Sequence, residues 1–288
     1  MIRKCICIIL SALFCTILSV GCGSHDKESV AVVGSESIAA KEVEKTAAAA
    51  GDLTVWSAYW DCDSDYAVIR DEAQYIDSIS LFAAYFKDGE LFIPDASLDM
   101  LKKIRKNDEL SGKRIFLSVV NDTEENGVSV QKDTNLLYRL LDNEDTAKAH
   151  ATELVAAAVD NGFDGIEIDY EKIRNDTELW RLFIRFENYL IAAADKADIL
   201  VRVVLESGTP TEKLSFPEGA EYAVMCYNLY GNGTEPGPKA DYAFLKDIYE
   251  RFGKLPGISY ALSDRGFDWE AGSVKPAQTD ADAAAETA

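Results

Sequence analysis

Short apolar runs alternate with longer segments of helical periodicity from residue 52 to residue 262. Strands separated by helical crossovers form parallel sheets, because each crossover returns the chain to the same edge. No glycine-rich phosphate loop is present, so the pattern favours an α/β fold of the (β/α)8 TIM-barrel type over a doubly wound sheet. The predicted strands are 53–60, 79–86, 114–120, 163–170, 199–205, 222–227 and 257–262. The clearest predicted helices are 145–160, 178–197 and 241–252.

Seven strands are predicted, one fewer than a complete (β/α)8 barrel contains. The 19 residues after Trp269 hold no strand-like apolar run. We therefore expect residues 51–288 to form a barrel domain that lacks its last strand. Two explanations stay open: the chain is a fragment of a longer protein, or the barrel is left open by one strand. The fragment is the favoured explanation.

Residues 1–21 have the pattern of a secretory signal peptide. Arg3 and Lys4 precede an apolar run of 16 residues, 5–20. A helix that spans a bilayer needs roughly 20 apolar residues, so this run is too short to be a stable membrane helix.

The cysteine that follows this run resembles the lipidated cysteine of bacterial lipoproteins. Residues 18–22 read LSVGC, with small residues before Cys22 and with Ser19 where these signals usually have leucine. Residues 22–50, rich in small and charged side chains, would then form a flexible tether. We expect an extracytoplasmic, cell-surface lipoprotein of a bacterium, in contact with the membrane through its lipid anchor only. The alternative is ordinary cleavage and release.

Charge and composition exclude several classes of function. The chain has 29 Lys and Arg residues against 50 Asp and Glu residues, a net charge of −21, which repels nucleic acids. It has only two histidines, His25 and His150, and only Cys62 and Cys226 lie outside the N-terminal segment. Histidine-based catalysis, a metal cluster and a disulfide framework are therefore not expected. We expect a monomer without cofactor or metal, and any catalysis should rest on carboxylates, tyrosines and amides.

The fourth predicted strand carries three acidic residues at alternate positions. Side chains alternate along a strand, so Glu167, Asp169 and Glu171 share one face at a spacing of about 6.6 Å, while Ile166 and Ile168 share the other. In a barrel, the isoleucines would meet the helices and the acids would point into the lumen. A solvated edge strand could carry the same pattern, but the position in mid-chain favours a buried strand.

A buried column of carboxylates is costly unless it serves a purpose. Neighbouring like charges cannot all ionise, so at least one of these acids should keep a proton near neutral pH. Glu171 lies nearest the C-terminal end of the strand, where the active sites of these barrels are found. A protonated carboxyl there would be a general acid.

The acidic segment, Asp164-Gly165-Ile166-Glu167-Ile168-Asp169-Tyr170-Glu171, resembles the DGxDxDxE signature of glycoside hydrolase family 18, which includes chitinases and endo-β-N-acetylglucosaminidases. Glu167 stands where the family usually has Asp. Residues 225–228, MCYN, resemble the Met-x-Tyr-Asp segment of the sixth strand, with Asn228 in place of Asp. Residues 266–269, GFDW, resemble a segment after the seventh strand. The resemblance covers residues 52–270.

The resemblance implies a retaining mechanism in which the N-acetyl carbonyl of the substrate is the nucleophile. Glu171 would be the general acid and base. Asp169 would orient the acetamide, and Glu167 would hold Asp169 by sharing a proton with it. Tyr227 would donate its hydroxyl to the acetamide oxygen with the help of Asn228.

Four further side chains are expected to contact the sugar: Tyr59, Trp60, Met225 and Trp269. Each of the three aromatic residues could instead belong to the core. The expected function is a secreted, surface-anchored glycosidase that hydrolyses β-linked N-acetylglucosamine glycans of the chitin, peptidoglycan or N-glycan type. The alternative is a catalytically weak or inactive carbohydrate-binding lipoprotein on the same barrel.

Overall fold

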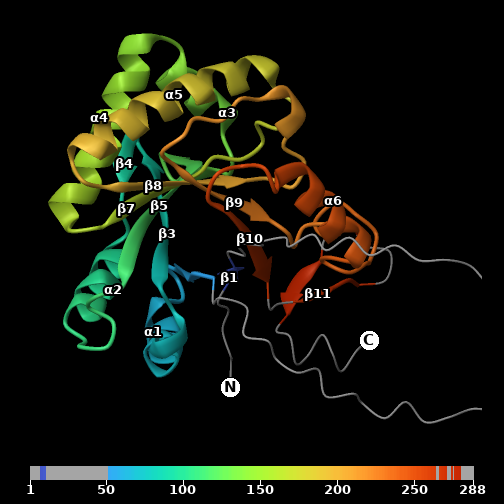
Figure 1. Cartoon of the computed structure of the whole chain (residues 1–288), viewed down its shortest axis with the longest axis horizontal. Helices are drawn as coiled ribbons and strands as arrows, with labels where there is room; N and C mark the ends of the chain where they lie inside the picture. The colour runs from blue at the N-terminus through green and yellow to red at the C-terminus, as the bar shows by residue number, and fades with distance from the viewer. Residues whose placement is uncertain (1–6, 11–50, 264–265, 271–273, 275, 280–288) are drawn as a thin grey trace, which may run out of the picture.

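Seven parallel strands curl around a common axis, and the helices that connect them lie on the outside (Figure 1). The structure is a computed structural model that describes residues 7–10, 51–263, 266–270, 274 and 276–279. The parallel strands follow one another in chain order, with β3 paired to β5. They are β2 Leu53–Ala58, β3 Ser78–Lys87, β5 Arg114–Glu125, β7 Gly165–Asp169, β8 Leu200–Leu205, β9 Glu221–Met225 and β10 Ile258–Ser263. All seven predicted strands are confirmed, and so is the incomplete (β/α)8 barrel.

Helices cover the outer surface of this sheet. They are α1 Cys62–Asp71, α2 Asp95–Arg105, α3 Thr134–Leu141, α4 Glu144–Asn161, α5 Thr177–Lys196 and α6 Tyr242–Phe252. The three predicted helices are α4, α5 and α6. Helix α4 begins with a capping box at Asn143 and ends at Gly162, whose φ of 82° is the left-handed conformation that glycine adopts easily. Among the described residues, no helix is both long and apolar enough to cross a membrane.

Short strands extend the barrel at its rim. β4, Glu90–Phe92, forms a hairpin with β3, and β6, Val128–Val130, forms one with β5. β11, Gly266–Asp268, pairs with β12, Ala277–Thr279. β12 lies among the residues after Trp269, where we predicted no strand. With β11 it forms a separate sheet of two strands and adds nothing to the barrel.

The place of the eighth barrel strand is held by β1, Cys7–Leu10, which lies between β2 and β10. It pairs with both neighbours in the antiparallel direction, whereas the other strands of the ring are parallel. β1 belongs to the segment that we predicted as the signal peptide. The predicted lipidation site Cys22 and the whole predicted tether, residues 22–50, lie outside the described residues.

Strand β7 is central, because β5 and β8 flank it on either side. This arrangement excludes the solvated edge strand as an explanation of the acidic column. Ile166 and Ile168 are fully buried in the apolar layer beneath the helices, as predicted. Gly165 begins the strand next to Phe116, where an added Cβ would lie 2.4 Å from Cε1 of the ring. Only glycine lets the two strands approach so closely here.

Candidate active site

The three acids lie at increasing exposure along the lumen, Glu167 and Asp169 in β7 and Glu171 two residues after its end. Glu167 is fully buried and Asp169 is 9% exposed, whereas the side chain of Glu171 is 18% exposed. The strand therefore leads from the closed interior of the barrel to its open C-terminal end. This order agrees with the prediction that Glu171 is the acid nearest the cleft.

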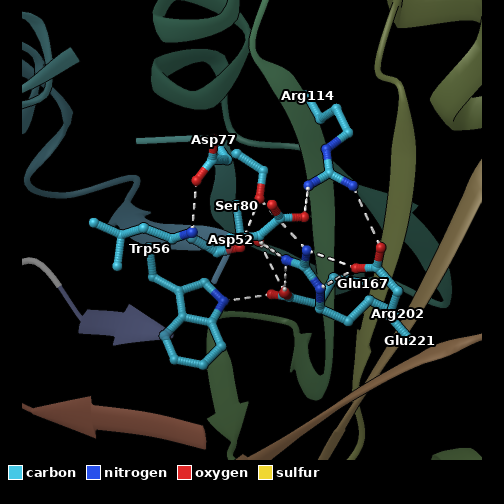
Figure 2. A network of polar contacts seen from close by, with 11 residues as sticks. Asp52, Trp56, Asp77, Ser80, Arg114, Glu167, Arg202 and Glu221 are labelled. Carbon is cyan, nitrogen blue, oxygen red and sulfur yellow. Dashed lines mark hydrogen bonds and ion pairs between the residues drawn. The ribbon is translucent and has the colours of Figure 1, made fainter. Parts of the chain in front are cut away.

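Glu167 accepts hydrogen bonds on both of its carboxylate oxygens (Figure 2). Nε1 of Trp56 donates to Oε1 at 2.5 Å, and Oγ of Ser80 donates to Oε2 at 2.8 Å. The guanidinium of Arg202 lies 3.2 Å from the same Oε2. These donors come from β2, β3 and β8, which surround the buried end of β7. The structure thus gives Glu167 other partners than the expected proton-sharing contact with Asp169.

Asp169 lies where protonation of its carboxyl group is favoured. Its pKa is raised well above the ordinary value, first by burial and then by the nearby charges of Glu171 and Glu167. Its Oδ1 is buried and has no hydrogen-bond partner within the described structure. The sequence predicts that at least one of the three acids keeps a proton, and burial and neighbouring charge favour it on Asp169.

Glu171 is held by the strand next to it. The side-chain amide of Asn121 accepts from the backbone N–H of Glu171 at 2.9 Å and donates to its carbonyl oxygen at 3.2 Å. The carboxylate of Glu171 forms an ion pair with the ammonium of Lys132, which follows β6. Both partners come from the β5–β6 hairpin and its flanks.

A cavity of about 290 Å³ opens above Asp169 and Glu171. Tyr59 and Trp60 line one wall, with Tyr85 beside them, and the β5–β6 hairpin lines another. The side chain of Trp60 is 59% exposed and packs edge to face on Tyr59 at 4.8 Å between ring centroids. Exposed aromatic faces next to carboxyl groups form a surface on which a sugar ring can stack.

The remaining predicted residues lie elsewhere. Tyr227 is half-buried and packs, like Trp56, against the small side chains at the end of β9 and β10. Asn228 is exposed and accepts a hydrogen bond from Ser207 at 2.8 Å. Met225 is buried, and Trp269 is half-buried with its ring 5.5 Å from that of Phe267. None of these four predicted residues is among the described residues that line the cavity.

Asn121, Lys132 and Arg202 are the site residues that our sequence reading missed. The Asn126-Gly127 pair between two short strands is a strong hairpin signal, and it could have placed Lys132 at the mouth of the barrel. Arg202 interrupts the apolar run 199–205, and a charged side chain on the lumen face of a strand needs a partner nearby. Glu167 on the preceding strand would have been the natural choice.

The buried histidine and the cysteines lie apart from this site. Nε2 of His150 is 2.7 Å from the hydroxyl of Tyr170, on the helix side of β7. Cys62 and Cys226 are both buried, as expected for small apolar side chains. The described residues contain no group of His, Cys, Asp and Glu that could hold a metal ion.

No protein-family model matches the chain, and no curated protein matches it either. Solved structures do: a chitinase from Chromobacterium violaceum superposes with a TM-score of 0.65 at 17% identity, over 81% of this chain and 74% of that chain. The chain has the fold of the family 18 glycoside hydrolases.

Two further structures with this fold are named as a lytic enzyme and as an agglutinin. The spore cortex-lytic enzyme SleL of Bacillus megaterium has a TM-score of 0.61 at 16% identity, over 81% of this chain and 56% of that chain. A chitinase-like agglutinin from Robinia pseudoacacia has a TM-score of 0.59 at 14% identity, over 81% and 79% of the two chains.

Proposed function

We propose that the protein is a glycoside hydrolase that cleaves β-linked N-acetylglucosamine glycans by a retaining, substrate-assisted mechanism. The observation that carries this proposal is the pair of acids, Asp169 and Glu171, at the base of an aromatic-walled cavity in a family 18 barrel. Asp169 ends β7 and Glu171 follows two residues later, so the two acids are too close together to flank a sugar from opposite sides as the two carboxylates of most glycosidases do.

Two other carboxylates line the cavity, and both have partners. Oδ1 of Asp122 accepts the backbone N–H of Lys132 at 2.8 Å. Glu124 forms an ion pair with Lys87 at 2.9 Å. Neither is therefore a free nucleophile, and this supports the acetamide of the substrate in that role.

The reaction would proceed in two steps. The proton held by Asp169 passes to Glu171, which gives it to the glycosidic oxygen while the acetamide carbonyl oxygen bonds to the anomeric carbon and the glycosidic bond breaks. The unpartnered Oδ1 of Asp169 is available to accept the acetamide N–H and so to orient the nucleophile. Glu171 then removes a proton from water as the water attacks the anomeric carbon and restores the acetamide.

The direct test is hydrolysis of chromogenic chitobiose and chitotriose conjugates by the purified protein. We expect turnover by the wild type and a loss of kcat of about 10²–10⁴-fold in Glu171→Gln, which keeps the shape and removes the acid. A panel of chitin, peptidoglycan and N-glycan cores, read by mass spectrometry, would then identify the natural polymer.

A carbohydrate-binding protein without catalysis is the second candidate, favoured by Asn228 in place of an acid and by the fold shared with an agglutinin. Binding of the wild type to chitin oligosaccharides without release of any product would decide for this candidate and against the hydrolase.

We also propose that the protein is exported and anchored to the cell surface through Cys22. The apolar run 5–20 and the small residues before this cysteine support the proposal. Cys22→Ala should move the protein from the membrane fraction to the medium. Equal partitioning of wild type and variant would contradict the lipid anchor.

A further inference from the structure

Hydrogen bonds from a side chain of β5 continue the strand pairing to the backbone of Glu171, beyond the end of β7. The pairing of β5 with β7 ends where Val120 lies opposite Asp169. Beyond that point, the side chain of Asn121 bonds both to the N–H and to the carbonyl oxygen of Glu171. Asn121 is fully buried, so this pair of bonds is shielded from water. The position of the proposed acid is therefore fixed from β5.

The same hairpin also supplies a cation to the side chain of Glu171. After the turn the chain returns to β5, where N–H of Asp133 donates to the carbonyl oxygen of Asn121 at 2.8 Å. Lys132 has a φ of 56°, a left-handed conformation that persists in a non-glycine residue only where its surroundings impose it. This conformation presents its ammonium to Oε2 of Glu171.

A second lysine holds the returning chain without contacting the acid. Nζ of Lys172 donates to the carbonyl oxygen of Gln131 at 3.1 Å. The two neighbouring lysines therefore make different contacts. Lys172 binds a backbone carbonyl, whereas Lys132 pairs with the carboxylate of Glu171.

The other ionisable carboxyl groups near Glu171 lie on several elements. Asp169 lies below it on β7, Asp122 faces the same cavity from β5, and Glu206 follows β8. Burial first, and then the charge of Glu171, raises the pKa of Glu206. Among the described residues that line the cavity, Lys132 is the single cation. Without Lys132, a negative charge on Glu171 would lie beside acidic side chains with no cation in the cavity lining to offset it.

We propose that Lys132 is a positioning residue for the general acid, an inference that rests on the proposed function. Its ammonium binds the carboxylate that remains on Glu171 once the proton has passed to the glycosidic oxygen. The oxygen leaves with that proton as the C1–O bond breaks and the acetamide oxygen bonds to C1. In the second step, water gives its proton back to Glu171 and the ion pair with Lys132 is released.

The role of Lys132 in proton donation can be distinguished from a purely structural role by varying the leaving group of the substrate. A sugar leaving group, as in chitotetraose, needs the proton of Glu171, whereas 2,4-dinitrophenolate leaves without it. We expect Lys132→Met to lower kcat/KM about 10–100-fold on chitotetraose and to leave the rate on 2,4-dinitrophenyl chitobioside within about twofold of wild type. Lys132→Arg keeps the positive charge and should retain most of the activity on both substrates.

Lys246→Met is the control, because it removes the ammonium of an exposed ion pair with Glu250 on α6, and neither residue lines the cavity. It should cleave both substrates at close to the wild-type rate. Urea unfolding midpoints of all three variants should match the wild type, since the side chain of Lys132 is 38% exposed.

Three outcomes would overturn the inference. An equal loss on both substrates would make Lys132 a structural residue only, and wild-type activity of Lys132→Met on chitotetraose would exclude any role. A wild-type protein that cleaves neither substrate would overturn the proposed function and the inference with it. The first two outcomes leave the proposed function intact, so the two failures are distinguishable.

Discussion

Arg202 and Glu167 lie directly opposite each other on adjacent strands and pair inside the barrel. Their side chains are 4% and 0% exposed, so the ion pair is enclosed (Figure 2). Arg202 also donates to Glu221 at 2.8 and 3.0 Å, and its guanidinium lies 4.0 Å from the ring centroid of Phe116. The lumen below the proposed active site is therefore filled in part by a network of charged side chains and not by apolar side chains alone.

Removal of Arg202 should destabilise the protein strongly. In Arg202→Met, the carboxylates of Glu167 and Glu221 lose a buried cation, and breaking one side of such a pair costs roughly 3–5 kcal/mol. The free energy of unfolding from urea denaturation measures the effect. The double variant Arg202→Met/Glu167→Gln should recover part of the loss, because it no longer buries the unpaired Glu167 charge.

The matched control for this prediction is Arg181→Met. Arg181 pairs with Glu178 on the surface of α5, with both side chains more than half exposed. An exposed pair contributes little to stability, so this variant should unfold close to the wild type. A similar loss in both variants would mean that the buried network has no special role.

Gly165 should be intolerant of even the smallest side chain. In Gly165→Ala, the new Cβ would overlap the ring of Phe116, and overpacking of this kind costs roughly 1–3 kcal/mol. Thermal unfolding should show a lower midpoint. A second change, Phe116→Leu, should make the alanine less harmful than it is in the wild-type background. Additive effects of the two changes would contradict the proposed steric clash.

The barrel could be predicted from the sequence because its signals are local. Each strand is a short apolar run and each crossover helix has a periodic apolar face, so ranges such as 199–205 agree with the structure within a few residues. The strand between β2 and β10 could not be predicted in this way. β1 is antiparallel and only four residues long, and it comes from a segment whose pattern indicates export.

The site was predictable only in part. The alternate spacing of Glu167, Asp169 and Glu171 predicts that they lie along the lumen whatever surrounds the strand, although β7 itself ends at Asp169. The partners of these acids depend on which strands and loops lie beside them, and no local pattern contains that information. Lys132 reaches Glu171 across 39 positions of sequence, and Arg202 reaches Glu167 across 35.

Glu187 makes stability depend on pH. It lies on α5, fully buried, with the hydroxyl of Tyr222 3.1 Å from its Oε1. Burial raises its pKa from 4.5 to about 8. The folded state then holds a proton that the unfolded state releases between these values, so this stabilising contribution is complete below about pH 4.5 and is lost as the pH rises through 8.

We therefore expect the difference in unfolding free energy between wild type and Glu187→Gln to change across this range. The wild type should lose up to about 1.4 kcal/mol per pH unit relative to the variant, whose amide does not titrate. Urea denaturation at pH 5, 6, 7 and 8 provides the comparison. Parallel pH profiles would show that Glu187 is ionised in the folded protein.

Residues 1–21, which would be removed in the proposed lipidation of Cys22, contain β1, so their removal should weaken the barrel. β1 pairs with β2 on one side and with β10 on the other, so its loss leaves two strand edges unpaired. We expect a lower unfolding midpoint and a tendency to self-associate, measured by thermal melting and sedimentation against the full chain. A monomer with the same midpoint would show that β1 contributes nothing to stability.

The acetamide of the substrate should be indispensable. If its carbonyl oxygen is the nucleophile, an analogue with a 2-hydroxyl group has nothing to form the cyclised intermediate and should not turn over. A thiazoline that resembles this intermediate should bind more tightly than substrate and inhibit. Asp169→Asn should lower kcat, because the amide cannot supply the negative charge that balances the intermediate. Cleavage of the 2-hydroxyl analogue at the rate of the acetamide sugar, or trapping of a covalent enzyme ester by a 2-fluoro sugar, would exclude substrate assistance.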